Sequence, residues 1–75
     1  MTQPLPTFYF ATCGGISGVL FSRRGRRLFL PTACGPLHVI QLDDVVVVLG
    51  EMAASMAPYV VQEIATRERE HGEVV

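Results

Sequence analysis

Four arginines around one glycine are the residues of this chain best suited to chemistry. Arg23, Arg24, Arg26 and Arg27 flank Gly25 between two apolar runs. Each guanidinium group carries a permanent charge and several N–H donors, so it binds carboxylates and phosphates. The cluster could contact the phosphates of a nucleotide or a nucleic acid, or an acidic patch on a protein. It could equally be a solvated hairpin tip that discourages edge-to-edge pairing of strands. We predict that these four arginines bind a partner.

The cysteines and histidines are the only soft metal ligands, and they do not form a zinc motif. Cys13, Cys34, His38 and His71 lack the pair of closely spaced cysteines that closes structural zinc sites. We therefore predict no metal site and no cofactor. In a four-stranded meander the two cysteines lie at the same sheet end but about 10 Å apart, which is too far for a disulfide. Both thiols are expected to be free.

No combination of residues predicts catalysis. Cys34 and His38 could be imagined as a nucleophile and its base. A chain of 75 residues leaves little room for a pocket and for a third, orienting group. Gly14, Gly15 and Gly18 do not form a phosphate-binding loop, because no Lys-Ser or Lys-Thr pair follows them. We therefore expect no catalytic residues and no enzyme.

The elements that must position the arginines are short strands. Aromatic and β-branched runs separated by glycine-containing turns predict four of them. The predicted strands are Thr7–Thr12, Ile16–Ser22, Arg27–Pro31 and Leu37–Leu42. The tight turn at Gly25 then joins the second and third strands and carries the arginines.

The segment from Asp43 to Arg69 is the longest one with apolar residues at helical spacing. Its apolar residues recur at steps of three and four, which places them on one face of a helix. They are Val45, Leu49, Met52, Met56, Val60 and Ile64. Asp43 or Asp44 can cap the start of this helix, and capping explains these acids better than cation binding does. Glu63 and Arg67 lie four residues apart in the favourable order for an ion pair.

Two features argue against one straight helix. Pro58 would kink a helix interior, so Ser55 can cap a second helix that runs to about Glu70. The residues Val45–Val48 are all β-branched and prefer strands. Residues 44–49 therefore have two interpretations, a helix or the second strand of a hairpin with Leu37–Leu42. We favour the helix because Asp-Asp is a poor two-residue turn.

These patterns predict one α+β domain over residues 1–75. Its fold class is ββββα, a four-stranded antiparallel meander followed by a C-terminal helical segment that is kinked or broken near Pro58. We expect residues 1–6 to be a loose extended lead and residues 72–75 to be a frayed tail.

Composition indicates that this domain has an uncovered apolar surface. Of its residues, 49% are hydrophobic and only 17% are charged. Both faces of the predicted strands are apolar, whereas one helical segment can cover only one face. We therefore expect a homodimer, or a partner docked on the open face. The net charge of −1 gives no global attraction to nucleic acid or to an anionic membrane.

The function predicted from these observations is binding rather than catalysis. We expect a small protein-binding module, an inhibitor or adaptor that docks on a larger protein, of the kind encoded by phages and mobile elements. The alternative is a dimeric nucleic-acid-binding protein that uses the arginine hairpin. The first residues lack the features of a secretory signal, and no apolar run reaches the roughly 20 residues needed to cross a membrane. A cytoplasmic protein without a membrane partner is therefore expected.

Overall fold

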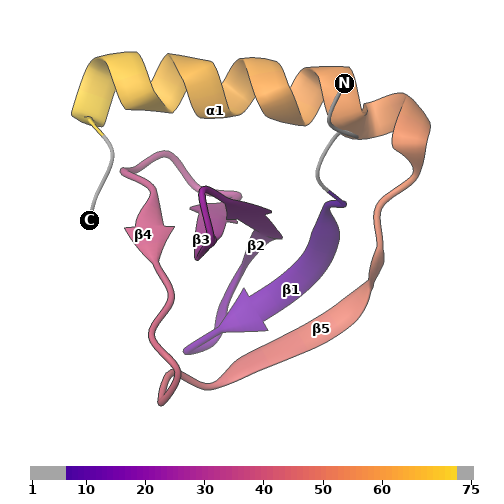
Figure 1. Ribbon diagram of the computed structural model, residues 1–75, viewed down its shortest axis with the longest axis vertical. Coiled ribbons are helices and arrows are strands. Elements are labelled where there is room, and N and C mark those ends of the chain that lie inside the picture. The colour runs from indigo at the N-terminus through magenta and orange to yellow at the C-terminus, as the bar shows by residue number, and fades with distance from the viewer. Residues whose placement is uncertain (1–6, 73–75) are drawn as a thin grey trace.

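The computed structural model describes residues 7–72 as an α+β fold, a five-stranded antiparallel sheet followed by one helix (Figure 1). The strands are β1 (Tyr9–Cys13), β2 (Ile16–Arg23), β3 (Arg26–Pro31), β4 (His38–Val39) and β5 (Val46–Glu51). A single 3₁₀ turn, η1 (Ala54–Met56), leads into the helix α1 (Ala57–His71). The predicted lead at residues 1–6 and residues 73–75 of the predicted tail lie outside the described residues.

The first four strands form the predicted meander. The sheet order is β4-β3-β2-β1-β5, and every neighbouring pair is antiparallel. The β1–β2 turn consists of Gly14 and Gly15 at φ 58° and 81°, and the β2–β3 turn consists of Arg24 and Gly25 at φ 55° and 73°. Positive φ at both central residues is the requirement of the hairpin turn whose twist matches that of the strands. The tight turn predicted at Gly25 is therefore confirmed.

The helix favoured for residues 44–49 is wrong, because Val46–Glu51 forms a fifth strand. The β-branched valines favour extended backbone, and β1 offers them a free edge on which to pair. The alternative interpretation, a strand in a hairpin with Leu37–Leu42, had the strand right but the partner wrong, because β5 pairs with β1 and β4 pairs with β3. The ladder continues beyond β5, where the backbone N–H of Met52 donates to the carbonyl of Phe8 at 2.7 Å.

Asp44 caps a turn and not a helix. The backbone N–H of Gln41 donates to the Oδ2 of Asp44 at 2.9 Å, and the N–H of Asp44 donates to the carbonyl of Gln41 at 3.1 Å. These two bonds reverse the chain between β4 and β5. The predicted role of Asp43 or Asp44 as a helix cap is therefore wrong.

The helix α1 begins where the proline predicts that it should. Pro58 lies in its first turn, where the missing N–H has no helical partner to lose. The residue at the N-cap is Met56, without a side-chain hydrogen bond, so the predicted cap at Ser55 is wrong. Gly72 ends the helix at φ 75°, and its N–H donates to the carbonyl of Glu68 at 2.9 Å. The predicted second helix is confirmed.

The sheet buries side chains on both of its faces. On the helix face, residues from β2 and β3, together with Phe8 just before β1, pack against Val60 and Ile64 of α1. This cluster comprises Phe8, Val19, Phe21, Leu28, Leu30, Leu37, Met52, Ala57, Val60 and Ile64. On the inner face, enclosed by the curl of the sheet, Ala11, Leu20, Phe29 and Ile40 form a second cluster, and Tyr9, Cys13 and Val46 pack against it (Figure 1). Residues of the chain itself therefore pack together on this second face of the sheet.

Gly18 makes the inner face possible. It pairs in register with Ala11 and Pro31, so it does not mark a bulge. A Cβ at this position would lie 2.6 Å from the Cζ of Phe29 and 2.3 Å from the carbonyl oxygen of Leu30. The absence of a side chain on Gly18 is what lets the Phe29 ring approach β2 this closely.

Among residues 7–72, no helix is long and apolar enough to cross a membrane.

Candidate functional site

The arginine hairpin extends beyond the end of β1. Tyr9, the first residue of β1, pairs with Leu20, whereas β2 continues to Arg23. Within the described chain, the last residues of β2 therefore have β3 on one side and no strand on the other. The helix α1 passes over this end of the sheet, and an open groove of about 1130 Å³ lies beside the hairpin. We call this feature the hairpin groove.

The hairpin groove has an apolar floor and a cationic rim. Phe8, Leu20 and Phe21 contribute buried rings and aliphatic groups, while three arginines come from the hairpin. The complete lining is Thr7, Phe8, Tyr9, Leu20, Phe21, Ser22, Arg23, Arg24, Arg27, Val48, Val61, Ile64, Ala65 and Glu68. Such a surface suits a ligand that presents an apolar group next to a negative charge.

One wall of the groove is a helical stripe that sequence reasoning missed. Val61, Ala65 and Glu68 are four and three residues apart, so they lie on one side of α1. The predicted stripe ran through Val60 and Ile64, which face the core. The available signal was a second apolar line, Val61 and Ala65, directly beside the first.

Arg23 holds the hairpin against this wall. Its Nη1 and Nη2 donate to Oε1 and Oε2 of Glu68 at 2.6 Å and 2.5 Å, and both side chains are about one-quarter exposed, at 29% and 27%. The hydrogen bonds from Arg23 hold the pKa of Glu68 below its usual value; burial opposes this shift, and the charges of Arg23 and Arg24 reinforce it. A bidentate arginine–carboxylate pair fixes orientation as well as distance. Arg23 therefore has a structural role at the site.

The structure divides the four predicted arginines into different environments. Arg23 is half-buried, whereas Arg24, Arg26 and Arg27 are exposed. Arg24 and Arg27 line the hairpin groove together with Arg23, while Arg26 lies outside its lining. Arg26 is opposite Arg23 across the hairpin ladder. The hairpin tip therefore presents three exposed guanidinium groups, two of them at the groove.

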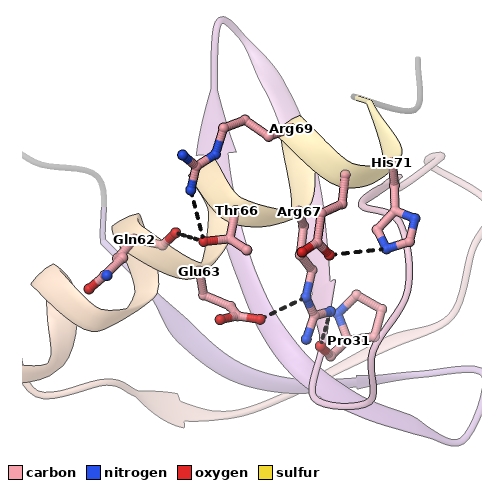
Figure 2. Close-up of polar contacts among 8 residues, drawn as sticks. Pro31, Gln62, Glu63, Thr66, Arg67, Arg69 and His71 are labelled. Atoms are coloured by element: carbon pink, nitrogen blue, oxygen red, sulfur yellow. Dashed lines mark hydrogen bonds and ion pairs between the residues drawn. The ribbon is translucent and has the colours of Figure 1, made fainter.

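Arg67 is a second important residue that the sequence only partly indicated. The predicted pair with Glu63 is confirmed, since the Nε of Arg67 donates to Glu63 Oε1 at 3.0 Å. Arg67 is also buried, and its Nη1 donates to the backbone carbonyl of Pro31 at 2.6 Å (Figure 2). This contact attaches α1 to the end of β3, while the neighbouring Glu68 attaches it to the end of β2. The helical wall of the groove is thus held from two sides.

The predicted soft ligands are not gathered into a site. Cys13 is half-buried against the inner face, and Cys34 is exposed in the segment between β3 and β4. In the part of the chain that the structure describes, no three His, Cys, Asp or Glu side chains are arranged to hold a metal ion.

The hairpin groove is equipped for binding. The described residues that line it include no histidine or cysteine, and their one carboxylate, Glu68, accepts the two hydrogen bonds from Arg23. The exposed residues Arg24 and Arg27 lie at the rim of the groove's apolar floor. Comparisons of the chain with protein-family models, with curated proteins and with solved structures found no match.

Proposed function

We propose that this protein is a small non-enzymatic binding module, an inhibitor or adaptor that docks on a larger protein through the hairpin groove. The observation that carries the proposal is the position of Arg24 and Arg27, exposed at the rim of an apolar groove of about 1130 Å³. The proposal places the protein in the cytoplasm and gives it no membrane partner.

The chemistry of the groove specifies the target segment. An apolar side chain can enter between α1 and the hairpin, where Phe8, Phe21 and Val61 provide its surroundings. Carboxylates next to that side chain can accept charge-assisted hydrogen bonds from the two rim arginines. Arginines and apolar anchors supply most of the energy in many protein interfaces. The target is therefore a protein surface with an apolar residue flanked by Asp or Glu.

A nucleic-acid target fits the structure less well. Proteins that bind single strands stack the bases on exposed aromatic rings. At the hairpin groove Phe8 and Phe21 are buried, the exposed Phe10 and Tyr59 do not belong to its lining, and the net charge is −1. Arg24, Arg26 and Arg27 could still contact a phosphate backbone, so the experiment includes this dimeric nucleic-acid-binding alternative as an outcome.

The proposal is tested by capturing the target from the native host's lysate, with and without nuclease, and by titrating the purified target. The key variant is Arg24→Ala with Arg27→Ala. A matched control is Arg69→Ala, which removes an exposed arginine of α1 that does not line the groove. We expect one protein to be retained after nuclease treatment. The double variant should bind this target at least about tenfold more weakly than the wild type, whereas Arg69→Ala should bind it as the wild type does.

Two results would overturn the proposal. Equal target binding by the double variant and by Arg69→Ala would show that the rim arginines do not contact the target. Capture that disappears with nuclease, together with a steep loss of binding as salt rises, would assign the hairpin to nucleic acid, because phosphate contacts release counterions.

A further inference from the structure

The outer edge of β5 is an unpaired strand edge. The sheet order ends at β5, which pairs with β1 on one side and, among residues 7–72, with no strand on the other. Such an edge presents a row of backbone N–H and C=O groups that can pair with another chain. Figure 1 shows β5 on the side of the sheet away from α1, so the helix does not cover this edge.

This edge is also apolar along Val45–Gly50, between the charged residues Asp44 and Glu51. Residues 45–50 contain no charged residue and no proline. Val45, Val47, Val48 and Leu49 expose 74%, 52%, 50% and 65% of their surface. Natural edge strands are usually blunted by a charge, a proline or a bulge. The one irregularity here is the register shift that leaves Leu49 unmatched, so Val46–Val48 remains a regular stretch.

The pattern of the ladder shows which backbone groups point outward. The two-residue turn Gly14–Gly15 makes the flanking pair of Cys13 and Ile16 a hydrogen-bonded one. Because this pattern alternates along β1, Thr12 directs its backbone groups to β5, where it pairs with Val47. The neighbours of Val47 in β5, Val46 and Val48, therefore present their N–H and C=O groups at the outer edge.

We propose that a second copy of this chain pairs with this edge, β5 against β5 and antiparallel, about a two-fold axis at Val47. Val46 of one copy then faces Val48 of the other, and their outward backbone groups satisfy one another. The two sheets become one continuous sheet. This inference goes beyond the proposed function, and it does not require the arginines.

The character of the edge argues for a second copy as its occupant. The run Val45–Gly50 offers no charge with which to select a charged partner, but it is complementary to itself under a two-fold axis. Val47 of one copy lies opposite Val47 of the other in a non-hydrogen-bonded pair, in which the two side chains approach closely. A stable interface buries roughly 800 Å² on each partner, which is more than one strand edge supplies. We therefore expect a weak dimer that dissociates on dilution.

The first test is sedimentation velocity over a series of concentrations across the micromolar range. We expect the wild type to pass from monomer to dimer. Val47→Lys places two like charges together at the axis and weakens association by about tenfold or more. Tyr59→Lys, which adds the same charge at an exposed position of α1, is the matched control and should dimerise like the wild type. Circular dichroism confirms that each variant is folded.

The second test locates the axis by cross-linking, and it does not depend on a destabilising charge. In a Cys34→Ser background, which removes an exposed thiol, Val47→Cys should form a covalent dimer on mild oxidation. Leu49→Cys, on the same edge but facing Val45 of the other copy, should not. A monomer at every concentration, a dimer insensitive to Val47→Lys, open-ended assemblies, or equal cross-linking at both positions would each overturn the proposal.

Discussion

Arg23 and Glu68 join the arginine hairpin to α1 through two parallel N–H···O bonds of 2.6 Å and 2.5 Å, although 45 residues separate them in the chain. The pair has two consequences. It leaves Arg23 half-buried, whereas Arg24, Arg26 and Arg27 are exposed. It also fixes the distance between the rim and the helical wall of the hairpin groove. The stability of the fold and the geometry of the site therefore depend on the same contact.

The first prediction concerns the pH dependence of this contact. The pKa of Glu68 in the folded protein lies below its usual value of 4.5, chiefly because Arg23 donates hydrogen bonds to it. The stabilisation is therefore complete above that usual value and is lost as the pH falls through the lower, folded-state pKa. Urea denaturation should show that Glu68→Gln lowers the free energy of unfolding by about 1 kcal/mol at neutral pH. The difference from the wild type should close as the pH falls through the lowered pKa of Glu68.

A matched control separates this effect from the general loss of a carboxylate. Glu51→Gln removes an exposed acid from β5 and should change the free energy of unfolding little at either pH. If the difference between the wild type and Glu68→Gln stays constant as the pH falls, the Arg23–Glu68 pair does not stabilise the fold through its charge.

The second prediction concerns the buried guanidinium of Arg67. Arg67→Met keeps much of the side-chain volume but leaves the Pro31 carbonyl without its donor at 2.6 Å. We expect a loss of about 2 kcal/mol in the free energy of unfolding, measured by urea denaturation. Glu63→Gln should lose well under about 1 kcal/mol, because Glu63 is half exposed and its pair with Arg67 lies within one helix. Equal losses in the two variants would assign the effect to the ion pair instead of the carbonyl bond.

The sequence was informative where local chemistry decides the structure. Gly14-Gly15 and Arg24-Gly25 specify tight turns, and Pro58 specifies the first turn of α1, so the meander and the helix were predictable. Residues 45–49 were not, because Val45 and Leu49 fit a helical stripe by spacing while their β-branched neighbours fit a strand. This segment is a strand because it pairs with the open edge of β1, which lies more than 30 residues earlier in the chain. No local pattern contains that information.

The site was predictable only in part for the same reason. The arginine cluster is visible in the sequence, but the groove requires Val61, Ala65 and Glu68 to lie opposite the hairpin. Their position depends on how α1 crosses the sheet. The assignment of Arg23 to an internal ion pair depends on the same packing, so the sequence alone could not separate it from Arg24 and Arg27.

The third prediction concerns the close approach of Phe29 to Gly18. Gly18→Ala would place a Cβ 2.3 Å from the Leu30 carbonyl oxygen, which backbone pairing holds in place. We expect it to lower the free energy of unfolding by about 2 kcal/mol or more in thermal or urea denaturation. Gly35→Ala is the matched control, because a Cβ there meets no atom within 4 Å. If Gly18→Ala left the free energy of unfolding unchanged, β2 and β3 could move apart without loss of stability.

The last prediction separates binding from stability at the hairpin tip. Arg24 has a φ of 55°, in the left-handed region that is unfavourable for most side chains but is tolerated by asparagine. Arg24→Asn should therefore raise the free energy of unfolding by about 0.5 kcal/mol, measured by urea denaturation. The same change removes a rim charge, so binding of the purified target should weaken several-fold. A residue with only a structural role would not move the two quantities in opposite directions.

Arg27→Asn provides the comparison for this prediction. It removes an equivalent charge from the groove at a strand position that pairs with Ser22, where no left-handed backbone is relieved. It should weaken target binding without any gain in stability, because asparagine is a poor strand former. If Arg24→Asn instead destabilises the protein, the side-chain contacts of Arg24 outweigh its backbone strain. The arginine is then present at the tip for the fold, and the binding role of the rim must rest on Arg27.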